Sequence, residues 1–125
     1  MSATSLSRFP IRIELEGFGV AKGELIRFLA PITVDALLRV LPLRGRVNIL
    51  KAQVYFEVPV KIGCEKAVSR VEKGDIGYWP FGSSLCFFKE QMLPYRPVNL
   101  VGKILSGLEV FQNVANGTPI AVYKE

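Results

Sequence analysis

The chain has 125 residues and a mass of 13.9 kDa, which is the size of one domain and hardly of two. Half of the residues are hydrophobic and 22% are charged, a balance that excludes intrinsic disorder and predicts one hydrophobic core. The formal charge is +5, but the basic residues are dispersed and form no stripe with aromatics, so we expect no nucleic-acid partner.

No apolar run reaches the ~18 residues of a membrane-spanning helix, and residues 1–12 lack the apolar stretch of a secretory signal. We therefore expect a cytoplasmic protein without a membrane partner. The expected organisation is a single domain over residues 1–125, in which residues 1–8 form a flexible N-terminal segment.

The first half of the chain predicts a hairpin, a short helix and further strands. Residues 9–16 alternate apolar and charged side chains before a turn at Gly17. Pro31 interrupts the strand pattern, and Thr33 offers the hydroxyl of an N-cap for a helix that ends at Pro42. The strands predicted here span residues 9–16 and 20–29 and a third extended segment, opened by Gly45, that includes 47–50 and 54–60.

The second half of the chain predicts more strands and one further helix. Ser106 and Glu109 have the spacing of a capping box, which favours a short helix behind them. The strands predicted here span residues 67–71, 75–79, 85–89, 98–105 and 120–123. Together the two halves predict a mainly β protein, a closed eight-stranded β-barrel with two short helices.

Histidine is absent from the sequence, and the only cysteines are Cys64 and Cys86. The lack of histidine excludes Ser-His-Asp and Cys-His catalysis and histidine-based metal sites. The two cysteines are too few and too far apart for a zinc or Cys-x-x-Cys redox pattern, although a disulfide between them stays open. We therefore expect no metal and no cofactor.

Several segments resemble cyclophilins, and they occur in the same order. GELIRFL and PITV (23–34) are similar to the cyclophilin opening strand and helix, GSSLCFF (82–88) to the Gly-Ser-Gln-Phe-Phe strand, and VGKILSGLEVF (101–111) to the closing segment. GDIGYWP (74–80) resembles a run in small prokaryotic cyclophilin-like proteins. The resemblance covers about residues 9–123 and implies an eight-stranded barrel in a family whose members mostly lack an assigned activity.

Prolyl isomerisation is the activity that cyclophilins carry out, against an amide barrier of ~18–20 kcal/mol. The resemblance implies a proline pocket and an arginine in a Phe-His-Arg run. The matching stretch, about residues 52–63, holds no arginine or histidine and brings in Glu57, and Cys86 replaces the pocket glutamine. Only Phe88, and after it Phe87, can be carried over from the pocket, and Arg96 lies in a proline-flanked loop. The catalytic set is thus largely missing, and we predict no catalytic residue.

An aromatic segment over residues 78–95 is the predicted binding site, since such rings line many small-molecule and peptide grooves. Strand alternation means that Tyr78 and Trp79 cannot both face the core, so at least one belongs at the surface or rim. The alternative is that Trp79 and Phe81 plug one end of the barrel. The candidate ligand-binding residues are Glu57, Tyr78, Trp79, Phe81, Phe88, Met92, Tyr95 and Arg96.

Three functions follow from this sequence. The favoured one is non-catalytic binding of a small molecule or peptide, with Trp79, Phe81 and Phe88 as apolar walls and Glu57 or Arg96 as polar anchors. A weak peptidyl-prolyl cis-trans isomerase is the first alternative. The second is a structural or oligomeric subunit, such as a homodimer, because the mean hydropathy of +0.30 indicates apolar surface that a partner would cover.

Overall fold

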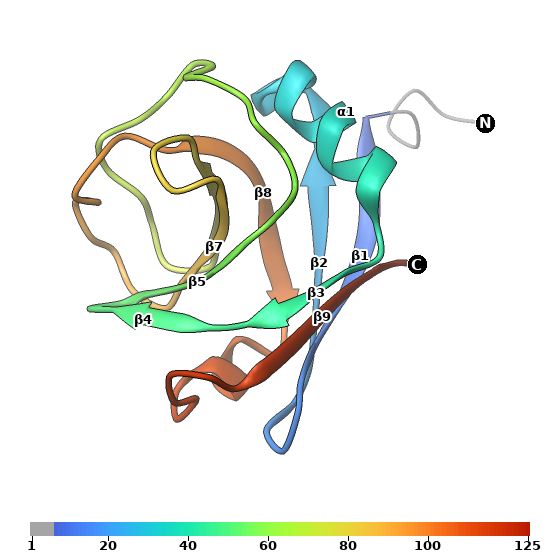
Figure 1. Ribbon diagram of the computed structural model, residues 1–125, viewed down its shortest axis with the longest axis vertical. Coiled ribbons are helices and arrows are strands. Elements are labelled where there is room, and N and C mark those ends of the chain that lie inside the picture. The colour runs from blue at the N-terminus through green and yellow to red at the C-terminus, as the bar shows by residue number, and fades with distance from the viewer. Residues whose placement is uncertain (1–6) are drawn as a thin grey trace.

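The computed structural model describes residues 7–125, in which nine strands form one sheet that curls into a nearly closed barrel (Figure 1). The strands are β1 (Arg8–Leu15), β2 (Gly19–Ile26), β3 (Leu43–Arg46), β4 (Asn48–Leu50), β5 (Gln53–Glu57), β6 (Asp75–Trp79), β7 (Ser84–Phe88), β8 (Asn99–Ser106) and β9 (Pro119–Lys124). Their order in the sheet is β3-β9-β1-β2-β8-β6-β7-β5-β4, and all neighbours are antiparallel.

The two ends of this order, β3 and β4, are joined in the chain by a single residue, Val47. One extended segment thus pairs first with β9 and then with β5, which links the two edges of the sheet. At Gly45 a Cβ would lie 2.8 Å from the ring of Phe56, so glycine lets that ring fill the space behind β3. The predicted count of eight strands is wrong, because the third extended segment and the residues just before it form three strands, β3, β4 and β5, while the predicted strand at residues 67–71 does not form.

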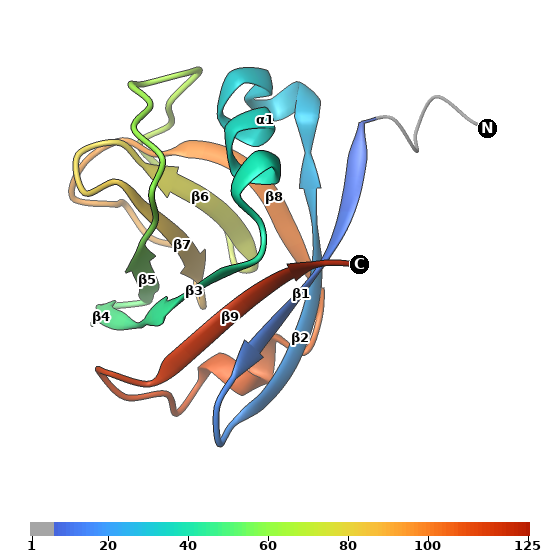
Figure 2. The same ribbon diagram turned by 45° about the vertical axis from the view of Figure 1, so that its right-hand side comes forward.

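The helix α1 (Pro31–Val40) starts earlier than predicted and lies beside β2 and β8 (Figure 2). Proline is well placed at the first helical position, because its fixed φ suits the helix and its missing N–H would be unpaired there. The N-cap is Ala30, and Thr33 is buried inside the first turn, so the prediction of Thr33 as N-cap is wrong. Val34 and Leu37 place the apolar face of the helix in the core.

The predicted second helix is instead the 3-10 turn η3 (Leu108–Phe111), and another 3-10 turn, η2 (Arg27–Leu29), ends the predicted second strand. The capping-box prediction is also wrong, because the N-cap is Gly107, with φ +82° and no side-chain cap. A Cβ on Gly107 would lie 2.7 Å from the carbonyl oxygen of Val20, so the close approach of β2 requires glycine here. Within residues 7–125 the fold therefore has one α-helix.

Two further predicted boundaries are corrected by the pairing. The predicted strand at residues 67–71 is a loop that makes isolated bridges, Val68 with Val98 and Val71 with Met92. Arg8, the last residue of the segment predicted to be flexible (1–8), pairs with Ile26 in the β1–β2 ladder and so belongs to a strand. Residues 1–6 lie outside the described part of the chain.

The core has two parts, one on each face of β5, β6 and β7. Phe56, Tyr78 and Phe87 face the barrel interior, where Phe87 stacks on Phe111 with ring centroids 5.2 Å apart. The alternating side chains of the same strands form what we call the outer cluster on the other face. The outer cluster consists of Val71, Cys86, Phe88 and Val98, with Tyr55, Val68, Trp79, Met92 and Leu100 packed against it.

Within residues 7–125, no helix combines the length and the apolar character needed to cross a membrane.

Candidate functional site

Tyr78 is part of the barrel core. Its side chain is fully buried, and its hydroxyl donates to the carbonyl of Val60 and accepts from the backbone N–H of Ile62 at 3.3 Å. These bonds anchor the loop that follows β5. Tyr78 therefore supports the fold and does not reach a ligand at the surface.

Phe88 and Cys86 are equally closed off in the outer cluster. Both are fully buried. Val71 bridges to Met92 and Val98 bridges to Val68, and Val71 and Val98, which lie outside the strands, pack against Cys86 and Phe88 on this face of β7. Burial raises the pKa of the Cys86 thiol, whose sulfur accepts a hydrogen bond from Gln53 Nε2 at 3.2 Å. Cys64 is exposed, and both cysteines are free thiols, so no disulfide joins Cys64 and Cys86.

Trp79 forms the boundary between the outer cluster and the surface. Its ring meets Tyr55 edge-on at 5.6 Å, and a Cβ on Gly82 would lie 2.7 Å from its ring, so the β6–β7 turn packs directly on the indole. The side chain is partly buried. As alternation predicts, Tyr78 faces the core and Trp79 the rim.

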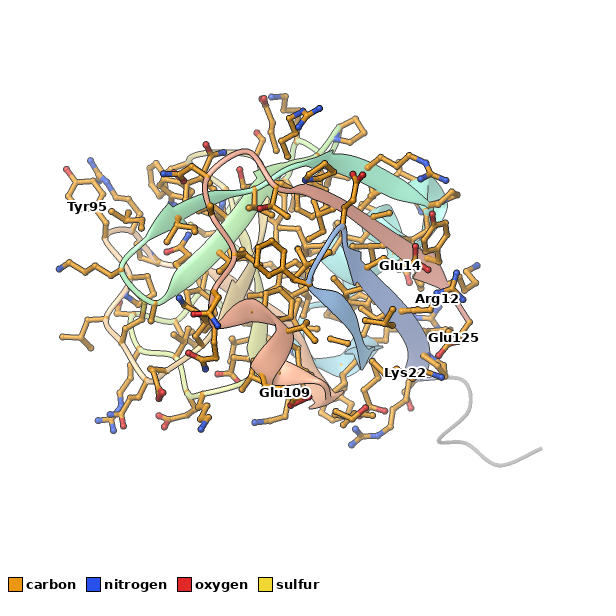
Figure 3. All side chains as sticks on the ribbon, turned by 90° about the horizontal axis from the view of Figure 1, so that it is seen from below. Arg12, Glu14, Lys22, Tyr95, Glu109 and Glu125 are labelled. Carbon is orange, nitrogen blue, oxygen red and sulfur yellow. The ribbon has the colours of Figure 1, made fainter. Side chains whose placement is uncertain are left out.

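Three surface residues meet at the β6–β7 turn, and we call them the aromatic platform: Phe81, Tyr95 and Arg96. The Arg96 Cζ lies 4.9 Å from the ring centroid of Phe81 and 5.4 Å from that of Tyr95, which are cation–π distances. Phe81 is 60% exposed and Tyr95 78% exposed. Figure 3 shows Tyr95 projecting from one edge of the molecule.

Glu57 and Met92 complete the predicted set, in different settings. Glu57 ends β5 opposite Ser84, and Trp79 lies opposite the same serine from β6, so the two share one face of the sheet. The Glu57 side chain is exposed and makes no hydrogen bond or ion pair with the described residues. Met92 packs on the outer cluster and acts as support.

One contact at this turn was missed by the sequence analysis. Ser83 has a φ of +48°, and its hydroxyl accepts a hydrogen bond from Lys61 Nζ at 3.1 Å. A serine nucleophile needs a neighbouring proton acceptor, whereas Lys61 is the donor in this bond. The pair therefore links the loop that follows β5 to the β6–β7 turn. No spacing rule links Lys61 to Ser83, so no sequence signal was available.

No group of three or more Cys, Asp or Glu side chains in the described part of the chain is placed to hold a metal ion.

The family of the chain follows from comparison with known proteins. A family model described as Cyclophilin-like matches residues 9–123. The chain belongs to the cyclophilin-like family. The resemblance found in the sequence is thus confirmed.

Solved structures support this cyclophilin-like fold. The chain is similar to the solution structure of the hypothetical protein AF2241 from Archaeoglobus fulgidus, with 28% identity, a TM-score of 0.80, and coverage of 95% of this chain and 96% of that one. It is also similar to McbB, solved in complex with tryptophan, with 13% identity, a TM-score of 0.76, and coverage of 92% of this chain and 44% of McbB. At that identity the likeness to McbB is one of fold alone. A search of the curated proteins gave no match.

Proposed function

We propose that this cyclophilin-like protein is a non-catalytic binding protein that holds a peptide segment on the aromatic platform. The observation that carries the proposal is the placement of the Arg96 guanidinium over two largely exposed rings, Phe81 and Tyr95. A contiguous exposed apolar patch rimmed by polar groups often marks a site of interaction with a partner. Tyrosine and arginine are also the residue types that dominate the energetics of protein interfaces.

The shape of the platform favours a peptide over a small molecule. Small ligands bind in concave sites that bury most of their surface, whereas Phe81 and Tyr95 are both largely exposed. Leu93, in the same loop as Tyr95, is also exposed and extends the apolar surface. An extended segment can lie across such a surface and cover it.

The charges of the site define the chemistry of that peptide. Arg96 makes no ion pair with any residue of 7–125, so its N–H groups are available to a carboxylate. The matching segment therefore carries an apolar or aromatic side chain next to an acidic one. Glu57, which shares a sheet face with Trp79, would accept a hydrogen bond from a cationic or hydroxyl-bearing residue farther along the segment.

Prolyl isomerisation has weaker support. Arg96 stands over Phe81 and Tyr95 at the surface, while Phe88 is buried under the loops that carry Val71 and Met92.

The third function, an oligomeric subunit, would use the same exposed rings as an interface between copies. Light scattering at several protein concentrations distinguishes this function, because a homodimer through the platform would dissociate in Tyr95→Ser.

Selection from a random heptapeptide display library tests the proposal. We expect enrichment of peptides with an aromatic or branched apolar residue beside Asp or Glu. Tyr95→Ser and Arg96→Gln should each weaken binding of a selected peptide about tenfold or more, as loss of an interface anchor does. The matched control is Leu105→Ser, which removes another exposed apolar side chain, 63% exposed, from β8.

Two results would contradict the proposal. Selected peptides that bind the platform variants as well as the unaltered chain would place the interaction elsewhere. Acceleration of prolyl isomerisation in a protease-coupled assay, lost in Arg96→Ala, would replace binding with catalysis.

A further inference from the structure

A second part of the surface, at the other end of the molecule, is hollowed. A hollow of about 770 Å³ lies against the β1–β2 hairpin, β9 and β3. Figure 3 shows Glu14 and Arg12, on this side, far from Tyr95 on the aromatic platform. None of the predicted site residues lines the hollow. Its volume is within the range of sites that enclose small molecules.

The strand register explains the shape and the polarity of this hollow. Ala121 in β9 lies directly opposite Glu14 in β1 and directly opposite Arg44 in β3. Side chains of directly opposed residues point to the same face of a sheet, with Cβ atoms about 5 Å apart. Because its side chain is small, Ala121 leaves space between the carboxylate of Glu14 on one side and the guanidinium of Arg44 on the other.

Glu16 extends the acidic side of this trough. It follows β1, its backbone N–H donates to the carbonyl of Pro119 at 3.1 Å, and it lines the hollow. Arg44 is steadied on the basic side, because its Cζ lies 5.2 Å from the ring centroid of Tyr123. The trough therefore has acidic side chains, Glu14 and Glu16, on one side and Arg44 on the other, with small residues between them.

The charged side chains of the trough differ in whether they have a charged partner within the protein. Glu14 accepts a hydrogen bond from Arg12 Nε at 2.8 Å. Glu16 and Arg44, in contrast, form no ion pair with any residue of 7–125. A negatively charged ligand would be attracted by Arg44 but repelled by Glu16. A positively charged ligand would be attracted by Glu16 but repelled by Arg44. A ligand that carries both charges satisfies both walls.

The hairpin supplies an apolar surface at the same place. Phe18 and Val20 line the hollow and are exposed. Val20 lies opposite Glu14 in the β1–β2 ladder, so it continues the row of Glu14, Ala121 and Arg44 on one face. We propose that this trough binds a small zwitterion, an α-amino acid with an apolar side chain. Its ammonium group meets Glu16, its carboxylate meets Arg44, and its side chain packs on Phe18 and Val20.

Titration with three related probes tests the charge requirement. L-Phenylalanine carries both charges, phenethylamine only the positive one and 3-phenylpropanoate only the negative one. We expect backbone NMR shifts at residues 16–20 and 119–123 with L-phenylalanine, and binding of each single-charge probe weaker by about tenfold or more, as for a lost charge-assisted hydrogen bond. Equal binding of all three probes, or no shift with L-phenylalanine, would overturn the proposal.

Charge-neutral variants locate the site. Arg44→Gln and Glu16→Gln, both at exposed positions, should each weaken L-phenylalanine binding by a similar factor, whereas Arg70→Gln and Glu90→Gln serve as exposed controls on other segments. Tyr95→Ser should leave this binding unchanged, since the platform is a separate surface. Binding that survives both trough variants would overturn the assignment even if a ligand is found.

Discussion

Glu65 closes the N-terminus of α1 through Thr33, which lies 32 residues earlier in the chain. The Glu65 Oε1 atom accepts from the Thr33 backbone N–H at 2.9 Å and from the Thr33 hydroxyl at 2.7 Å, while Oε2 accepts from the Ile32 N–H at 3.0 Å. Asn99 connects to the same contact, because its Nδ2 donates to the Thr33 hydroxyl at 3.1 Å and its Oδ1 accepts from the Glu65 backbone N–H at 2.8 Å. A residue from a distant loop thus performs the capping that the sequence analysis assigned to Thr33.

This cap makes stability depend on pH in a defined direction. Burial acts to raise the pKa of Glu65, but the hydrogen bonds from Ile32 and Thr33 and the charge of Lys66 outweigh it and hold the pKa below its ordinary value. A carboxyl group with a lowered pKa in the folded state stabilises the fold at pH values above its unfolded pKa, and this contribution is lost as the pH falls through the folded pKa. We expect Glu65→Gln to reduce the free energy of unfolding at pH 7 by about 1 kcal/mol, the typical value of a cap.

Urea unfolding at pH 7 and at pH 3 measures this effect. The difference between Glu65→Gln and the unaltered chain should be smaller at the lower pH, because the stabilisation by the ionised carboxylate declines as the pH falls below the unfolded pKa of Glu65 towards its lowered folded pKa. Glu90→Gln, at an exposed position, is the control and should show no such change. A difference of equal size at both pH values would show that the charge of Glu65 is not what stabilises α1.

Phe81 and Phe88 should respond very differently to truncation. Phe88 is fully buried in the outer cluster, so Phe88→Ala leaves a cavity and should reduce the free energy of unfolding by about 3–5 kcal/mol. Phe81→Ala removes an exposed ring and should change it by less than about 0.5 kcal/mol, while it weakens binding of peptides selected on the platform. Chemical denaturation of both variants checks the contrast, and a Phe88→Ala protein as stable as Phe81→Ala would refute the closed outer cluster.

The contact of Gly82 with Trp79 gives a third prediction. Gly82→Ala places a Cβ 2.7 Å from the indole ring, so the ring or the turn must move, and we expect a loss of about 1–3 kcal/mol as in other overpacked sites. The emission of Trp79, the single tryptophan of the chain, should shift as well. Gly63→Ala is the matched control, because its Cβ would meet nothing within 4 Å. Unchanged emission in Gly82→Ala would contradict the packing of the turn on the ring.

Much of the barrel was predictable, because strand alternation and turn residues are local properties. The alternation at residues 9–16 corresponds to β1, whose Ile11, Ile13 and Leu15 are buried. The cyclophilin-like segments likewise carry the family over residues 9–123. Local patterns failed where a distant contact outweighed them, as at Thr33, whose hydroxyl serves Glu65 and Asn99.

The sequence by itself determined the fold family and the residue types available for binding, because hydrophobic period and segment order are written along the chain. Only the tertiary structure decided that Phe81 is open to solvent while Phe88, seven residues later, is closed off. It also decided that Glu14 and Arg44 face each other across Ala121. Exposure and proximity depend on which distant strands and loops pair, and pairing between remote segments leaves no periodic mark in the sequence.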